Sequence, residues 1–462
     1  MSRIKIGYLP LYIELYDLTS PEMRPKIEAF NQIISNRLKE DYEVCEAPIC
    51  RIKPEFEDAI KMFEKEKVEV IVTLHLDYSP SLESSEALAS TDIPIVVLDT
   101  TREYDFGPTQ SVDEIMFNHG IHGVQDMCNL LKRNKKQYFV EAGHWKYSDV
   151  FDRVASCIRS ISTANAFRNA RVGIVGEPFE GMGDFAVPFD RMKKDIGVEI
   201  IPFDFEWSEN ELEKVSEEEI QNDYEFCKQN YDVRDIKDDV WNRSARTNLV
   251  LRKWIEKENL TACTVNFLET ENNAGLPVMP FLEISRQMAK GVGYAGEGDA
   301  LTAAFVGALL HVYPETSFTE MFCPDWKNNS IMLSHMGEIN VDLTAERALV
   351  VEKDWTFTNA PNPVTAYGRF KAGRAVLVDL APSGEGEYTL IVAPVEVLSV
   401  EGQDNMAWSI HGWFRPVNCD ISKFLSEYSF AGGTHHLAMV YGNVEKEIEM
   451  FGKLMHFDVV SI

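Results

Sequence analysis

The sequence predicts an α/β protein in which two doubly wound, Rossmann-like parallel-sheet domains precede a C-terminal antiparallel, β-barrel-like domain. In the first half, short apolar segments alternate with amphipathic helical patterns, as they do in βαβ units. After about residue 312, apolar segments follow one another with few helical patterns between them, which is typical of an antiparallel sheet or barrel. The predicted domains are residues 1–168, 169–312 and 313–462.

Local patterns predict the individual elements. The strands expected in the first domain are residues 3–9, 43–49, 68–76, 94–100 and 137–143. A helical pattern then runs over about 145–168. The second domain is expected to contain strands near 171, at 198–206 and at 262–267, with an acidic helical region over 207–258. The C-terminal strands are expected at 347–353, 364–370, 374–381, 387–398 and 406–414.

Composition excludes several classes of partner. The net charge is −29, from 74 acidic and 45 basic residues, so the surface repels nucleic acid and anionic membranes. The N-terminal residues contain no long apolar segment with a cleavage site, and we expect no signal peptide. The eight cysteines form no C-x-x-C pair, which favours buried thiols in a reducing cytoplasm over disulfides or a zinc site.

One glycine-rich segment, GVGYAGEGDALTAAF, contains the G-x-G-x-x-G pattern of dinucleotide-binding loops at Gly291, Gly293 and Gly296. That fingerprint requires a strand before it and a helix after it, whereas the apolar spacing over 280–290 is helical. We therefore expect a loop between two helices that presents Glu297. Asp299 is expected to cap the N-terminus of the following helix.

Further acids and histidines accompany Glu297. Glu320 lies in TSFTE, His335 follows an apolar strand pattern in IMLSHMGEI, and His435 and His436 enter another in AGGTHHLAMV. Because side chains alternate along a strand, we expect only one of the two adjacent histidines to face a common site. Two carboxylates and two imidazoles suit a divalent first-row metal such as Mn²⁺ better than zinc. Each residue alone is also compatible with a capping, ion-pair or core role.

Four motifs in the same order resemble the L-arabinose isomerase family: AGEGDALTAA, TSFTE, SHMGEI and AGGTHHL. The resemblance covers most of the chain and is strongest over 261–338 and 431–437. It implies two α/β domains and a C-terminal β-rich domain, an arrangement shared with L-fucose isomerase. This agrees with the architecture expected from the local patterns.

The resemblance implies a Mn²⁺-dependent aldose–ketose isomerase, with Co²⁺, Fe²⁺ or Mg²⁺ as alternative metals. The implied metal ligands are Glu297, Glu320, His335 and His436. Glu297 and Glu320 are also expected to serve as base and acid in a cis-enediol mechanism, in which the metal stabilises charge on two sugar oxygens.

Other family positions carry over as substrate contacts, namely His122, Phe267, Leu11 and Tyr12. In the family the histidine reaches the substrate from a neighbouring subunit, and the family is hexameric. We therefore expect a homo-oligomer, a hexamer or a trimer, with sites between subunits. A structural role remains open for both His122 and Phe267.

Departures from the family pattern concern the substrate. Leu9 stands where the family has a glutamine that contacts sugar hydroxyls, residues 321–324 replace an acidic and aromatic segment, and Ala300 and Leu301 replace a Trp-Lys pair. A site that loses a polar partner discriminates differently among hydroxyls, so the exact sugar stays open. The alternatives are an enediolate-forming lyase, dehydratase or epimerase, a non-catalytic sugar-binding protein, and a nucleotide-dependent enzyme.

Overall fold

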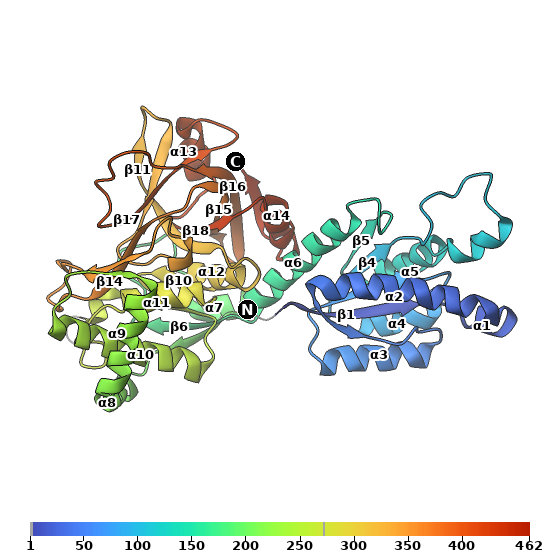
Figure 1. Ribbon diagram of the computed structural model, residues 1–462, viewed down its shortest axis with the longest axis horizontal. Coiled ribbons are helices and arrows are strands. Elements are labelled where there is room, and N and C mark those ends of the chain that lie inside the picture. The colour runs from blue at the N-terminus through green and yellow to red at the C-terminus, as the bar shows by residue number, and fades with distance from the viewer. Residues whose placement is uncertain (1–2, 271–272) are drawn as a thin grey trace. The chain divides into compact units, whose positions relative to one another are not determined.

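The computed structural model describes residues 3–270 and 273–462 (Figure 1). The chain divides into two compact units, one ending at Ser162 and the other covering Thr163–Ile462. Helix α6 (Val150–Arg168) runs through the boundary between them. The three domains expected from the sequence, with boundaries at 168 and 312, remain a prediction.

The N-terminal unit contains a five-stranded parallel sheet in the order β2-β1-β3-β4-β5. Its strands are β1 (Lys5–Leu11), β2 (Glu43–Glu46), β3 (Val70–His75), β4 (Ile95–Asp99) and β5 (Tyr138–Ala142). Its other helices are α1 (Glu14–Thr19), α2 (Arg24–Asp41), α3 (Lys53–Lys65), α4 (Ser81–Ser90) and α5 (Ile121–Arg133), with 3₁₀ turns Pro21–Met23 and Val112–Phe117. Every residue of β3 is buried, because helices cover both faces of a doubly wound sheet.

The second unit begins with a four-stranded parallel sheet in the order β10-β9-β6-β7. Its strands are β6 (Arg171–Val175), β7 (Glu199–Pro202), β9 (Ala262–Val265) and β10 (Gly293–Gly296). The helices in this region are α7 (Phe189–Asp195), α8 (Phe205–Lys214), α9 (Glu217–Asn230), α10 (Asp238–Glu258), α11 (Phe281–Ala289) and α12 (Ala300–Val312), with the 3₁₀ turn Phe267–Thr270. The acidic segment predicted to be helical is indeed α8–α10.

The C-terminal strands close into a six-stranded antiparallel barrel in the order β16-β15-β18-β11-β12-β17, because β17 also pairs with β16. The barrel strands are β11 (Thr316–Asp325), β12 (Ser330–Ser334), β15 (Gly373–Gly384), β16 (Glu387–Val397), β17 (Ile410–Pro416) and β18 (His436–Tyr441). Strands that extend the sheet are β8 (Asp232–Val233), β13 (Leu349–Glu352), β14 (Val364–Arg369) and β19 (Asp458–Ser461). Helices α13 (Ile421–Phe430) and α14 (Glu445–Leu454) and the 3₁₀ turn Val341–Leu343 complete the region. The predicted fold class is confirmed.

Helix α12 joins the parallel sheet to the barrel. It packs on β10, β9 and β6, and also on β11, β18 and β15. Its residues Ala300–Leu310 are all buried, which explains why this helix is apolar on every side. The capping prediction is confirmed, since the Asp299 side chain accepts a hydrogen bond from the Thr302 backbone N–H.

The prediction of a loop between two helices is wrong in one respect, because residues 293–296 form strand β10. The glycines in this segment indicate close packing instead of a turn. A Cβ on Gly293 would lie 2.2 Å from the backbone nitrogen of Gly307 in α12, so only glycine lets this strand and helix approach so closely. The segment before Gly291 is helix α11, as expected, and the dinucleotide fingerprint therefore lacks its required context.

Candidate functional site

Glu297 leaves the end of β10 in a left-handed backbone conformation, with φ +66°. Its backbone N–H donates to Val265, and its carbonyl accepts from the Phe179 N–H. The next residue, Gly298, also has positive φ, and a Cβ there would lie 2.6 Å from Pro178. Backbone strain of this kind in a non-glycine residue is held by its surroundings and concentrates at functional sites.

The barrel register brings the other residues together. Glu320 on β11 pairs directly with His436 at the start of β18 and with Ser334 on β12, and His335 immediately follows Ser334. Glu320 Oε1 lies 3.2 Å from His335 Nε2 and 3.0 Å from His436 Nε2. Glu297 Oε2 lies 3.7 Å from His436 Nε2. The four expected metal ligands thus form one cluster.

Each imidazole in this cluster is oriented by a second carboxylate. His335 Nδ1 lies 2.6 Å from Glu338 Oε2, and the Tyr294 hydroxyl donates to the other oxygen of Glu338. His436 Nδ1 lies 2.9 Å from Asp299 Oδ2. Because a carboxylate oxygen accepts, each ring holds a proton on Nδ1, and this orientation directs Nε2 towards Glu320. Carboxylate-oriented histidines of this kind are typical of metal ligands.

Packing restricts both rings further. The Phe318 ring meets His335 and His436 edge to face, with ring centroids 4.7 and 5.1 Å apart. Phe185 stacks on His436 at 5.1 Å. Gly296 leaves the space that His335 needs, because a Cβ there would lie 3.1 Å from its ring. The cluster is therefore rigid before anything binds to it.

The electrostatics favour a cation. Burial acts to raise the pKa of Glu320, but His335 and His436 outweigh it and hold this pKa well below its ordinary value. Burial acts to lower the pKa of His335, but Glu338 and Glu320 raise it well above its usual range. Burial also acts to lower the pKa of His436, but Asp299 and Glu320 raise it above its ordinary value. The carboxylates thus generate a negative potential at the imidazole nitrogens.

The donor set fits a divalent metal. Two overlapping groups have ligand atoms close enough to share an ion, Glu320–His335–His436 and Glu297–His435–His436. Glu297 Oε2 and His436 Nε2 are buried without a hydrogen-bond partner in the part of the chain that the structure describes, although Glu320 lies near the latter. Buried polar atoms without partners are costly, and both would be satisfied as ligands. Carboxylate and imidazole donors suit first-row ions such as Mn²⁺.

The prediction that only one of the two adjacent histidines faces the common site is wrong, because His435 lies at the cluster as well as His436. Its ring centroid lies 4.1 Å from that of His436, and His435 Nε2 lies 3.8 Å from Glu297 Oε2. Alternation applies within a strand, but β18 begins only at His436, and His435 belongs to the preceding turn. Its Nδ1 lies 2.6 Å from Asp184 Oδ2. Burial alone would lower the His435 pKa, but Glu297 and Asp184 raise it to about 9.

The orienting groups were not assigned from the sequence. Glu338 and Asp299 lie inside the motifs SHMGEI and AGEGDALTAA, but nothing in the sequence says that their carboxylates reach the histidines. Asp184 lies in the glycine-rich turn after β6, and Tyr294 inside β10. The one available signal was topological, because the carboxyl ends of β6, β9 and β10 meet at the same edge of the parallel sheet.

The expected substrate contacts lie in both units. Phe267 lines a small pocket together with Glu297 and His335, and its ring stacks on Phe179 at 5.5 Å. In the N-terminal unit, His122 is exposed in the first turn of α5. Leu11 and Tyr12 are fully buried at the end of β1. Leu9, the position of the family's glutamine, is part of the hydrophobic core of that unit.

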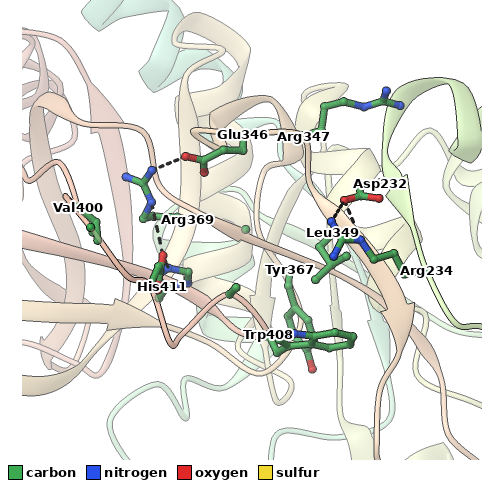
Figure 2. Close-up of a pocket in the computed structure, with 14 residues that line it drawn as sticks. Asp232, Arg234, Glu346, Arg347, Leu349, Tyr367, Arg369, Val400, Trp408 and His411 are labelled. Carbon is green, nitrogen blue, oxygen red and sulfur yellow. Dashed lines mark hydrogen bonds and ion pairs between the residues drawn. The ribbon is translucent and has the colours of Figure 1, made fainter.

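A larger pocket of about 420 Å³ lies elsewhere in the second unit (Figure 2). Arginine side chains line it, but their charges are already compensated. Arg234 pairs with Asp232, and Arg369 pairs with Glu346. Arg347 donates to backbone carbonyls. The pocket shares no residue with the Glu/His cluster, and none of the expected site residues lies in it.

Within residues 3–270 and 273–462, no helix has both the length and the apolarity to cross a membrane. All eight cysteines are free thiols.

Comparison with known proteins decides the family. The family models of the L-arabinose isomerase central domain and C-terminal domain match residues 192–313 and 315–458. The chain is a divergent member of the L-arabinose isomerase family. The members of this family are aldose–ketose isomerases, which are intramolecular oxidoreductases.

Several relatives match nearly the whole chain. L-arabinose isomerase of Shouchella clausii is 25% identical over 409 residues, which cover 85% of this chain and 81% of the relative. The protein of the same name from Geobacillus thermodenitrificans is 24% identical over 473 residues, covering 96% and 92%. That of Herpetosiphon aurantiacus is 23% identical, covering 96% and 91%.

Proposed function

We propose that this chain is a metal-dependent aldose–ketose isomerase that interconverts a free aldose and its 2-ketose through a cis-enediol. The observation that supports the proposal is the cluster of Glu297, Glu320, His335 and His436, in which both histidines are oriented by buried carboxylates. A protein that only binds sugar has no need of this oriented donor set.

Glu297, Glu320, His335 and His436 would hold the metal, with Mn²⁺ as first choice and Co²⁺, Fe²⁺ or Mg²⁺ as alternatives. Bound there, the ion would supply a Lewis acid that stabilises negative charge on the two sugar oxygens. Asp299 and Glu338 hold a proton on each Nδ1 and so keep Nε2 of both histidines turned towards the proposed metal position.

The two glutamates carry the proton transfer. One carboxylate removes the proton from C2 of the aldose, the C2–H electron pair forms the C1=C2 bond, and the C1=O1 electron pair moves to O1, which takes up a proton to give the enediol. Return of the first proton to C1 draws the C1=C2 pair, O2 forms a double bond to C2 and gives up its proton, and the ketose results. The low pKa of Glu320 keeps that carboxylate ionised, as a base requires. Glu297, which lines the small pocket beside Phe267, is the other carboxylate of the proposed pair.

Subunit contacts complete the proposal. We infer a homo-oligomer, hexamer or trimer, with sites between subunits, in which His122 reaches a neighbouring subunit's site. The support is the family habit together with exposed apolar side chains on the N-terminal unit, such as Val112 and Ile115. Native mass spectrometry would measure the subunit number, and a monomer would contradict this part.

The free thiols support a cytoplasmic location.

The exact sugar is the open part of the function, and one experiment both names it and tests the reaction. Metal-stripped enzyme, with Mn²⁺ restored, is incubated in D₂O with free pentoses, hexoses and deoxy sugars and followed by proton NMR. Mn²⁺-dependent entry of deuterium at C1 of a ketose is the expected result. Exchange without ketose formation would indicate an epimerase or lyase instead. No exchange with any sugar would contradict the proposal.

A further inference from the structure

The cavity of about 420 Å³ in the second unit has the features of a ligand site, although it lies apart from the Glu/His cluster (Figure 2). Its walls come from segments that are distant in the chain, namely β8, the residues before β13, β14, and the residues between β16 and β17. Cavities that hold a small molecule combine aromatic or apolar side chains with a few placed polar groups. Both kinds of side chain are present here.

The aromatic surface of the cavity is the indole of Trp408. This residue lines the cavity and is 56% exposed. In Figure 2 its ring lies below and between the ion pairs on either side of the cavity. Tyr367 also lines the cavity but is buried, and its hydroxyl accepts from Lys353 Nζ at 3.1 Å. Trp408 therefore offers a ligand a flat apolar face, and Tyr367 is a fixed part of the wall.

The segment that carries Trp408 is anchored on both sides of the indole. Asp404 Oδ2 lies 2.8 Å from His411 Nε2, and Asp404 Oδ1 accepts from the Met406 N–H at 2.9 Å. The N–H and the hydroxyl of Ser409 both donate to the Met406 carbonyl. Because the protein itself fixes this turn, a ligand does not have to order it, which reduces the entropic cost of binding.

The polar groups of the cavity are ion pairs with free hydrogen-bonding positions. Arg234 contacts Asp232 through Nε and Nη2, and both contacts are to Oδ2. Arg369 Nη2 contacts Glu346 Oε1. In the part of the chain that the structure describes, the second oxygen of each carboxylate and the Nη1 group of each arginine have no hydrogen bond. Each pair thus offers an acceptor beside a donor, and a hydroxyl group, which donates and accepts at once, can use both.

The charge of the lining favours a neutral ligand. Equal numbers of arginines and carboxylates line the cavity, namely Arg234, Arg347, Arg369, Asp232, Glu346 and Asp404. Arg347 already donates to three backbone carbonyls. An anionic ligand would have to replace an existing partner of an arginine and would face the carboxylates. A cation would face the arginines. A polyhydroxyl compound meets neither obstacle.

We propose that this cavity is a second sugar-binding site, in which a neutral mono- or disaccharide stacks on Trp408 and hydrogen-bonds to the Asp232–Arg234 and Glu346–Arg369 pairs. The C–H face of the sugar ring covers the indole, and hydroxyls at the edge of the ring reach the free positions of the two pairs. The site binds sugar without converting it. It is independent of the proposed isomerase activity, since it shares no residue with the Glu/His cluster.

Fluorine NMR of the full chain labelled with 5-fluorotryptophan reads this site directly. Trp408→Phe assigns the Trp408 resonance through its disappearance. Trp326, in the turn between β11 and β12, is 64% exposed and lies outside the cavity, so it is the matched control. The metal-stripped chain is titrated with D-glucose, D-galactose, L-arabinose, maltose and lactose. At least one of these sugars should shift the Trp408 resonance saturably and leave that of Trp326 unchanged.

Carboxylate variants test the polar contacts. Asp232→Asn and Glu346→Gln should each weaken the response of Trp408 by ~10-fold, because a hydrogen bond to a charged acceptor is lost. Glu218→Gln, at an exposed position of α9, should leave it unchanged. Thermal unfolding checks that each variant is folded. Unchanged affinity in both cavity variants would overturn the assigned contacts.

Other outcomes decide against a second sugar site. If none of the sugars shifts the Trp408 resonance, or if both resonances shift equally, the proposal is wrong. A shift with inorganic phosphate but with no neutral sugar would indicate an anion site instead. A Trp408 shift that depends on protein concentration without sugar would mean that a second copy of the chain covers the cavity. Glu297→Gln should keep the Trp408 response, so failure of the isomerase proposal leaves this one standing.

Discussion

His335 and His75 are both buried histidines at the end of an apolar strand, yet their surroundings differ completely. His335, after β12, has a carboxylate at each ring nitrogen, Glu338 at Nδ1 and Glu320 at Nε2. His75, at the end of β3, has no hydrogen-bond partner at either nitrogen among the described residues. Burial lowers the pKa of His75 to about 3, whereas the pKa of His335 is raised.

The difference shows that burial alone does not make a histidine functional. An imidazole without partners stays neutral in the core and attracts no cation. An imidazole between two carboxylates has a fixed orientation and lies in a negative potential. The following experiments test this contrast between the two units, from the largest expected effect to the smallest.

The largest effect is expected at Glu297. Glu297→Gln keeps the size of the side chain but removes the carboxylate proposed to move a proton, so turnover should fall by ~10³-fold or more. Ketose formation measured with the sugar that the screen identifies provides the readout. Glu213→Gln, at an exposed position of α8, is the matched control and should be fully active. Near-normal activity of Glu297→Gln would rule out its proposed role.

A smaller effect is expected from the orienting carboxylates. Asp299→Asn preserves a good helix cap for α12 but removes the charge that holds His436, and Glu338→Gln does the same for His335. Each change should weaken Mn²⁺ binding by ~10- to 100-fold, measured by titration against a chelator. His75→Gln, in the N-terminal unit, should leave Mn²⁺ affinity unchanged. Equal losses of Mn²⁺ affinity in all three variants would contradict the proposed difference between the two histidine environments.

The stability of the N-terminal unit should depend on pH through His75. Its folded pKa is about 3 against an ordinary value of 6.5, so the unfolded chain binds more protons below pH 6.5. The free energy of unfolding should therefore be unaffected by His75 above pH 6.5 and fall at lower pH, by up to ~1.4 kcal/mol per pH unit, until about pH 3.

Hydrogen exchange in peptides covering β3 measures this dependence, and His75→Gln should abolish it. The comparison uses the slope with pH and not the absolute stability, because the substitution itself perturbs a packed core. A slope that persists in the variant would assign the acid sensitivity to other groups.

The smallest effect is expected at the wall of the site. Phe267 contributes an aromatic surface beside Glu297 and His335 but no polar atom. Phe267→Leu should raise KM by ~2- to 10-fold, because an aromatic contact contributes ~0.5–1.5 kcal/mol, with kcat little changed. Steady-state kinetics gives both constants. A large loss of kcat would mean that the ring positions Glu297.

Sequence reasoning predicted the fold because its signals are local. Alternation of apolar segments with helical patterns predicted both parallel sheets. The scarcity of helical patterns after residue 312 predicted the barrel. Segment 293–296 was assigned incorrectly because its glycines suggest a turn, whereas their function is to let β10 and α12 pack closely. Backbone proximity between distant elements has no local signature in one sequence.

The candidate site was predictable only in part. The motifs led to Glu297, Glu320, His335 and His436, and the structure brings these four together. Their partners could not be predicted, because a carboxylate such as Asp184 reaches His435 only through the tertiary fold. The sequence patterns VIVTLHL and IMLSHM look alike, and only the folded chain distinguishes His75 from His335.

The cross-strand pairing of Glu320 with His436 has a kinetic consequence. The two residues are far apart in the chain, and contacts of high sequence separation form late in folding because closing a long loop is costly in entropy. A refolding chain can have both parallel sheets in place and still lack a complete ligand set. Affinity for Mn²⁺ should thus arise together with closure of the barrel, so that the ion serves as a reporter of the last folding event.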